Sequence, residues 1–145
     1  MLAKDIMRKN VVSVTPQMTL KQVASLFSRR NISGAPVVST QGKLIGVISQ
    51  TDMIGQKPEA SGRQINANGV RRKKPNDLRV EQAMTPFGVS FEEDTSVREL
   101  ARQMLAKRIH RVVITRGGDI CGIVTSMDML RALLTMIDTA VPLRQ

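Results

Sequence analysis

The chain has 145 residues, 41% of them hydrophobic, and a formal net charge of +10 from 22 basic and 12 acidic residues. No apolar run approaches the roughly 20 residues that a membrane-spanning helix needs, and the charged N-terminus is unlike a signal peptide, so we expect a cytoplasmic protein. One cysteine and one histidine are too few for a structural zinc site, and we expect no metal.

The first half of the chain predicts a strand, a helix, two strands and a second helix. Thr19 and Gln22 have the spacing of a capping box, and the apolar residues behind them recur at helical intervals. Two β-rich runs follow, with a turn at Gly42 between them. The predicted elements are a strand near 12, a helix over 20–27, strands at 36–38 and 44–48, and a helix from about 52.

A basic segment joins the two halves. Residues 55–79 contain seven basic residues against two acidic ones, several glycines and prolines, and little apolar periodicity. A connection of this length is uncommon inside a compact domain. It is either a solvated linker or a site for phosphate or nucleic acid, and the sequence leaves both interpretations open.

The second half predicts the same order of elements. Ser96 and Glu99 form its capping box, Gly117 and Gly118 its turn. The predicted elements are a strand near 89, a helix over 97–104, strands at 112–115 and 120–124, and a helix from about 128 with a clear apolar stripe.

The two halves are copies of one unit. The stretch from Gly46 to Asp52 is echoed from Gly122 to Asp128, and earlier positions correspond at an offset of 77. A unit of about 50 residues is too small to bury an adequate core alone, so we expect one pseudo-symmetric folded module. The expected boundaries are repeat 1 over 1–56, a basic linker over 57–79, repeat 2 over 80–139 and a tail over 140–145.

Each copy carries a hydroxyl three residues before a carboxylate, Ser49 with Asp52 and Thr125 with Asp128. This pattern before a helix can be cap chemistry alone, because the hydroxyl and the acid satisfy orphan backbone N–H groups. It can also be ligand chemistry, because a carboxylate at a helix start accepts hydrogen bonds from a vicinal diol. The spacing alone does not decide between them.

The repeat resembles the CBS domain (the cystathionine β-synthase type), and the two copies resemble a tandem pair, or Bateman module. The features that recur in order are a Met before the first strand, the run from Ile32 to Val38, the glycine hairpin, and Gly-φ-φ-[ST]-x-x-Asp. One departure is Val113, where the family has the proline that repeat 1 keeps at Pro36. The resemblance implies an α/β (α+β) fold, with two small sheets facing each other and helices outside.

The resemblance also implies a ligand, an adenine nucleotide in the cleft between the copies. The implied ribose contacts are Ser49, Asp52, Thr125 and Asp128. His110 and Arg111 resemble the phosphate-binding pair of the gamma subunit of the AMP-activated kinase. The implied adenine contacts are Val12, Ile32, Ser33, Gly34, Val89 and Ile109, and Thr85 is a further implied ligand contact.

We therefore expect a regulatory sensor of AMP, ADP or ATP, with S-adenosylmethionine as a further candidate ligand and no required cofactor. No nucleophile–base constellation is visible, so we expect no catalysis. The helices after Asp52 and Asp128 are the expected homodimer face, and the regulated protein is unknown. Two alternatives stay open: a nucleic-acid-binding protein acting through residues 55–79, and a purely structural dimerisation module.

Overall fold

The chain forms two compact units of mixed α and β structure, each with a three-stranded sheet, which confirms the expected fold class. The computed structural model describes residues 1–54, 78–86 and 89–140. Of these, unit 1 comprises 1–11 and 89–140, and unit 2 comprises 12–54 and 78–86. The repeats therefore exchange their opening segments: the start of the chain packs with the second repeat, and residues 78–86 pack with the first.

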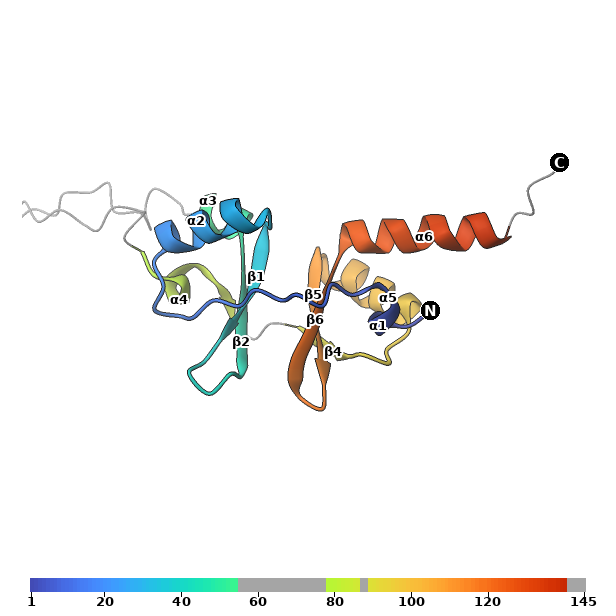
Figure 1. Ribbon diagram of the computed structural model, residues 1–145, viewed down its shortest axis with the longest axis horizontal. Coiled ribbons are helices and arrows are strands. Elements are labelled where there is room, and N and C mark those ends of the chain that lie inside the picture. The colour runs from blue at the N-terminus through green and yellow to red at the C-terminus, as the bar shows by residue number, and fades with distance from the viewer. Residues whose placement is uncertain (55–77, 87–88, 141–145) are drawn as a thin grey trace, which may run out of the picture. The chain divides into compact units, whose positions relative to one another are not determined.

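Unit 2 contains most of the first repeat (Figure 1). Its sheet has the order β1-β2-β3, and both pairs are antiparallel. Its elements are α2 (Leu20–Arg30), β1 (Gly34–Val38), β2 (Leu44–Ser49), α3 (Gln50–Ile54), α4 (Val80–Ala83) and β3 (Thr85–Pro86).

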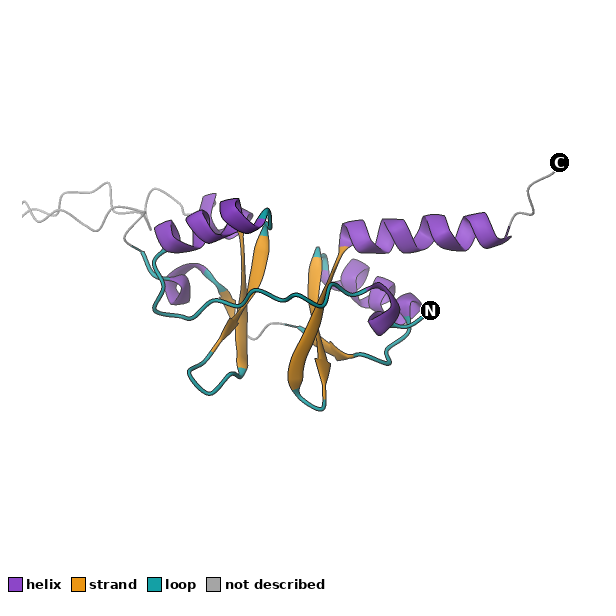
Figure 2. Cartoon of the chain, in the orientation of Figure 1, coloured by secondary structure: helices purple, strands orange, loops and turns teal. Residues whose placement is uncertain are grey.

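Unit 1 contains most of the second repeat. Its sheet has the order β4-β5-β6, with β4 parallel to β5 and β5 antiparallel to β6. Its elements are α1 (Ala3–Ile6), β4 (Ser90–Glu92), α5 (Val97–Lys107), β5 (Arg111–Arg116), β6 (Asp119–Thr125) and α6 (Ser126–Ala140). In each unit the helices gather on one face of that unit's own sheet (Figure 2).

The two predicted amphipathic helices are confirmed with their caps. Thr19 Oγ1 accepts a hydrogen bond from the Gln22 N–H at 3.2 Å, and Gln22 Oε1 accepts one from the Thr19 N–H at 2.9 Å. Ser96 Oγ likewise accepts from the Glu99 N–H at 3.1 Å. These bonds satisfy donors that have no partner inside a helix. The apolar faces behind the caps are buried in the two cores.

The opening strands of the repeats differ, and a proline explains why. In unit 1 the Val113 N–H donates to the Val89 carbonyl, and β4 continues from there along β5. The equivalent residue in unit 2 is Pro36, which has no N–H to donate. The predicted strand near 12 is accordingly reduced to one isolated parallel bridge, between Val14 and Val37.

The exchanged segments supply part of each core. Ala3 and Val80 are both 0% exposed, and each belongs to the hydrophobic core of the unit that it enters. Backbone bonds hold them there, because the Ala3 N–H donates to the Thr95 carbonyl at 2.7 Å and the Val80 N–H donates to the Met18 carbonyl at 2.9 Å. The four-residue helix α1 thus belongs to the unit that contains the second repeat, and α4 belongs to the unit that contains the first repeat.

Candidate functional site

The two [ST]-x-x-Asp motifs lie at strand–helix junctions, between β2 and α3 in unit 2 and between β6 and α6 in unit 1. In unit 2 the Ser49 N–H donates to Asp52 Oδ2 at 2.8 Å, and Ser49 Oγ accepts from the Asp52 N–H at 3.2 Å. In unit 1 the Thr125 N–H donates to Asp128 Oδ2 at 2.9 Å, and Thr125 Oγ1 accepts from the Asp128 N–H at 3.4 Å. The cap interpretation is confirmed in both units, and each carboxylate is held in one orientation.

Asp128 is the more enclosed of the two carboxylates. It is 6% exposed, whereas Asp52 is half-buried. Besides the cap, Asp128 Oδ1 accepts from Arg8 Nε at 3.3 Å and from Arg131 Nη1 at 3.0 Å. Both arginine side chains are more than half exposed, so the negative charge of Asp128 is balanced by two positive charges on its solvent side. Sequence reasoning assigned no role to Arg8 or Arg131.

The first residues of β1 and of β5 pair with the hydroxyl residue of the motif in their unit. Gly34 pairs with Ser49 across β1 and β2, and Arg111 pairs with Thr125 across β5 and β6. The expected phosphate residue Arg111 is therefore a cross-strand neighbour of the expected ribose residue Thr125. Neighbouring positions on paired strands have side chains within reach of one small ligand.

His110 is exposed and turned toward the start of α6. Its carbonyl accepts from the Ser126 N–H at 2.9 Å, and its Nδ1 lies 3.4 Å from Ser126 Oγ. In unit 2 the Ser33 carbonyl accepts from the Gln50 N–H at the same length. His110 and Ser33 thus occupy equivalent places, beside the first residue of α6 and of α3.

Each unit has an open groove between its two longer helical segments. The unit 2 groove, of about 570 Å³, lies between α2 and α3, and the unit 1 groove, of about 1000 Å³, lies between α5 and α6. Ile32 and Ser33 line the first, and Ile109 and His110 line the second, so these four expected ligand contacts face the helical side of their units. The two [ST]-x-x-Asp carboxylates line neither groove.

The remaining expected contacts lie on the sheets. Val12 and Val89 are half-buried at the opening of their repeats, and Val89 offers its carbonyl to β5. Thr85 is exposed on β3, paired with Val47. The equivalent pairing in unit 1 joins Arg8 to Ile123, so Thr85 and Arg8 occupy matching positions.

Other chemistry is sparse in the described part of the chain. No group of three or more His, Cys, Asp or Glu residues there could hold a metal ion. Burial raises the pKa of the Cys121 thiol, which makes it a poor nucleophile at neutral pH. None of the described helices has the length and hydropathy that crossing a bilayer requires.

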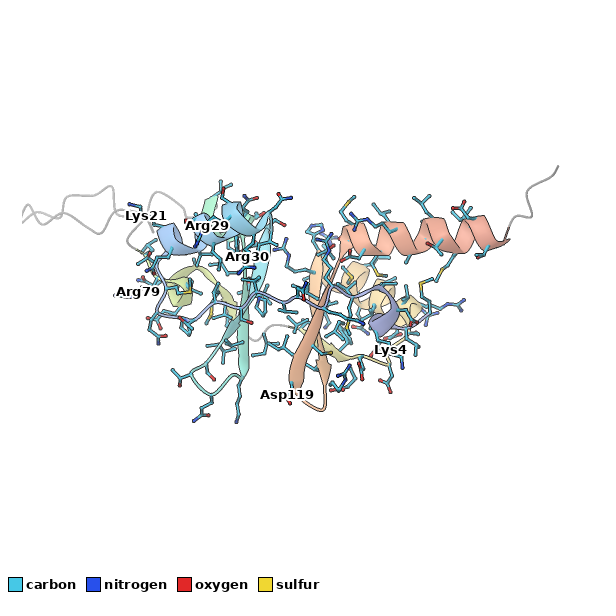
Figure 3. The ribbon with its side chains drawn as sticks, in the orientation of Figure 1. Lys4, Lys21, Arg29, Arg30, Arg79 and Asp119 are labelled. Atoms are coloured by element: carbon cyan, nitrogen blue, oxygen red, sulfur yellow. The ribbon has the colours of Figure 1, made fainter. Side chains whose placement is uncertain are left out.

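The nucleic-acid alternative depends on residues 55–79, of which only 78 and 79 are among the described residues. Arg79 contributes to the surface of unit 2 near α2, where three further basic side chains are exposed, Lys21, Arg29 and Arg30 (Figure 3). The Arg79 guanidinium donates to the Gln17 carbonyl, so part of it has a structural role.

Two copies of a small α+β unit, each with a capped carboxylate at the strand–helix junction, define a tandem pair of one repeat type. The family model of the CBS domain matches this chain twice, over residues 3–58 and 80–135. The chain therefore belongs to the CBS domain family and contains a CBS pair.

Relatives and solved structures agree with this assignment. An uncharacterized protein of Methanocaldococcus jannaschii, MJ1426, is 30% identical, and the match covers 92% of each chain. The CBS domain pair of protein MJ0100, solved with 5′-methylthioadenosine and S-adenosyl-L-methionine, is 25% identical with a TM-score of 0.76, covering 94% of this chain and 98% of that one. CBSX2, solved in complex with AMP, has a TM-score of 0.74 at 23% identity over 94% and 98%, which shows the common fold.

Proposed function

We propose that this chain is a regulatory module that binds an adenine nucleotide or a related adenosine ligand, with ribose held by Ser49 and Asp52 in one repeat and by Thr125 and Asp128 in the other. The observation that carries the proposal is the repeated geometry of the motif. In both units a carboxylate stands at the first turn of a helix, and the backbone N–H of the hydroxyl residue three positions earlier donates to it. The CBS pair of MJ0100, solved with two adenosine compounds, supports this ligand class.

The chemistry of the motif suits a ribose. A carboxylate that a backbone N–H holds in place, and at Asp128 the Thr125 hydroxyl as well, loses little rotamer freedom when it accepts hydrogen bonds from the 2′- and 3′-hydroxyls. Arg111 stands beside Thr125 across the sheet, and a guanidinium makes forked contacts to phosphate oxygens. His110 and Thr85 are further proposed contacts. That the ligand lies between the two repeats stays a prediction, as do the adenine contacts and the choice among AMP, ADP, ATP and S-adenosylmethionine.

We expect AMP, ADP, ATP or S-adenosylmethionine to raise the unfolding temperature of the wild-type chain, and the Asp52→Ala, Asp128→Ala double variant to lose that increase. A ligand at one hundred times its dissociation constant adds about 2.7 kcal/mol to the free energy of unfolding. Thermal unfolding with and without each ligand measures this increase. For each protein the increase is taken relative to the same protein without ligand.

The control separates ligand loss from cap loss. Both aspartates cap a helix, so the double variant loses stability without any ligand. A Thr19→Ala, Ser96→Ala double variant loses two helix caps elsewhere and should keep the full ligand-induced increase. If no adenine ligand stabilises the wild type, the motifs are caps alone and the proposed function is wrong.

We also propose that the chain forms a homodimer through the helices that follow the two motifs. In unit 1 the helix α6 carries a row of exposed apolar side chains that water disfavours, Leu130, Leu133, Leu134, Met136 and Ile137. Leu105 on α5 is 80% exposed across the groove from them, and Ile54 in unit 2 is 82% exposed. A second copy of the chain is the partner that we propose for this surface.

Leu133→Asp is expected to weaken self-association at least about thirtyfold, because it places a charge in the centre of the proposed interface. Sedimentation equilibrium over a dilution series measures the effect. Thr139→Asp adds the same charge to the same helix outside the groove and should leave the dissociation constant unchanged. A wild-type chain that stays monomeric would refute the dimer, and a regulatory role would then require another partner.

A further inference from the structure

The two proposed ribose sites differ at one matched position. Arg8 forms an antiparallel bridge with Ile123: the Arg8 N–H donates to the Ile123 carbonyl at 2.9 Å, and the Ile123 N–H donates to the Arg8 carbonyl at 3.0 Å. Thr85 holds the corresponding place beside Val47 in unit 2. Both positions pair antiparallel with the strand that leads into the motif, but one site has a guanidinium there and the other a hydroxyl.

The Arg8 guanidinium donates to Asp128, the carboxylate that is proposed to bind the ribose. A carboxylate has about four acceptor positions. Those of Asp128 are already engaged: Oδ2 by the N–H and Oγ1–H of Thr125, both at 2.9 Å, and Oδ1 by Arg8 and Arg131. A vicinal diol therefore cannot bind Asp128 without displacing one of these donors.

Arg8 is the donor that a ribose displaces most easily. The Thr125 N–H is fixed in the backbone, and Arg131 lies on the same helix as Asp128, in an i,i+3 pair at 3.0 Å. The Arg8 contact is longer, 3.3 Å, and Arg8 comes from a segment far from Asp128 in sequence. Its side chain, like that of Arg131, is more than half exposed, so it can swing away without disturbing the core. Once displaced, the guanidinium stays tethered beside the sugar by the bridge to Ile123.

From this geometry, and resting on the proposed function, we infer that Arg8 makes the unit 1 site select phosphorylated adenosine ligands over neutral ones. A neutral nucleoside displaces Arg8 from Asp128 and offers it no new partner. A nucleotide displaces it as well, but its phosphate accepts the released guanidinium, which restores a charged pair. Thr85 makes no such exchange, so the unit 2 site discriminates less.

Isothermal titration with AMP and with adenosine tests this, in an Asp52→Ala background that removes the unit 2 carboxylate. We expect Arg8→Thr to weaken AMP binding about tenfold or more, the range of a hydrogen bond to a charged group, and to leave adenosine binding equal or tighter. Arg102→Thr removes the same charge from an exposed position on α5, and it should leave the ratio of the two dissociation constants unchanged.

The reciprocal change provides a second test that does not depend on how Arg8→Thr folds. In an Asp128→Ala background, Thr85→Arg should give the unit 2 site a new preference for AMP over adenosine. If both variants leave the AMP-to-adenosine ratio as it was, while the parent backgrounds bind AMP, the inference about Arg8 is wrong and the proposed function stands. If the wild type binds neither compound, this inference is wrong, and the proposed function is then decided by thermal unfolding with ADP, ATP and S-adenosylmethionine.

Discussion

Ala3→Asp, a substitution at the third residue of the chain, is expected to destabilise the unit formed by the second repeat by about 3 kcal/mol or more. Ala3 is 0% exposed and packs in the core that contains Leu100 and Val124, so the new carboxylate would be buried without a partner. Hydrogen exchange measured by mass spectrometry should show lost protection in α5, β5 and β6, with α2, β1 and β2 less affected.

The mirror substitution should reverse the pattern. Val80 comes directly after the basic segment 55–79, yet it belongs to the core of unit 2 with Phe27 and Ile48. In Val80→Asp, protection from hydrogen exchange should therefore fall in α2, β1 and β2. Asn10→Asp adds the same charge at an exposed residue of unit 1 and should change little. Loss of protection confined to the repeat that carries the substitution in sequence would contradict the exchange of opening segments.

The exchange itself could not be predicted from the sequence. The periodicity and the caps predicted the helices well, because capping boxes and apolar spacing are local signals. The pairing of opening segments with sheets is not local. Met7 could pack over Gly46 or Gly122, and Met84 likewise, since both repeats offer the same small residue in the same motif. Side-chain patterns fit either pairing, so only the folded chain distinguishes them.

The local contacts of the candidate site could also be predicted from the sequence, but its contacts between distant residues could not. The reciprocal bonds between Thr125 and Asp128 follow from their spacing at a helix start. Arg131 could have been found as an i,i+3 partner of Asp128 on a predicted helix. Arg8 could not, because its contact with Asp128 spans 120 positions and exists only through the exchanged segment. The amphipathic pattern of the final helix was visible, but its groove with α5 requires the packed unit.

The glycine that opens each motif should be sensitive to substitution. A Cβ built on Gly122 would lie 2.7 Å from Met7 Cγ and closer still to Met7 Sδ, and one on Gly46 would lie 2.7 Å from the Thr85 carbonyl oxygen. Real Cβ atoms do not approach other atoms so closely. We expect Gly122→Ala and Gly46→Ala each to lower the free energy of unfolding by about 1–3 kcal/mol, the usual cost of overpacking, measured by denaturant titration.

Truncating the methionines distinguishes the two clashes. At Gly122 the two shortest contacts are with the Met7 side chain, so in a Met7→Ala background the cost of Gly122→Ala should fall by about 1 kcal/mol or more. At Gly46 the shortest contact is with backbone, and Met84→Ala leaves it in place, so the rescue there should be smaller. Additive effects in the Met7 cycle would mean that the contact with Met7 does not set the cost of Gly122→Ala, which would contradict this prediction.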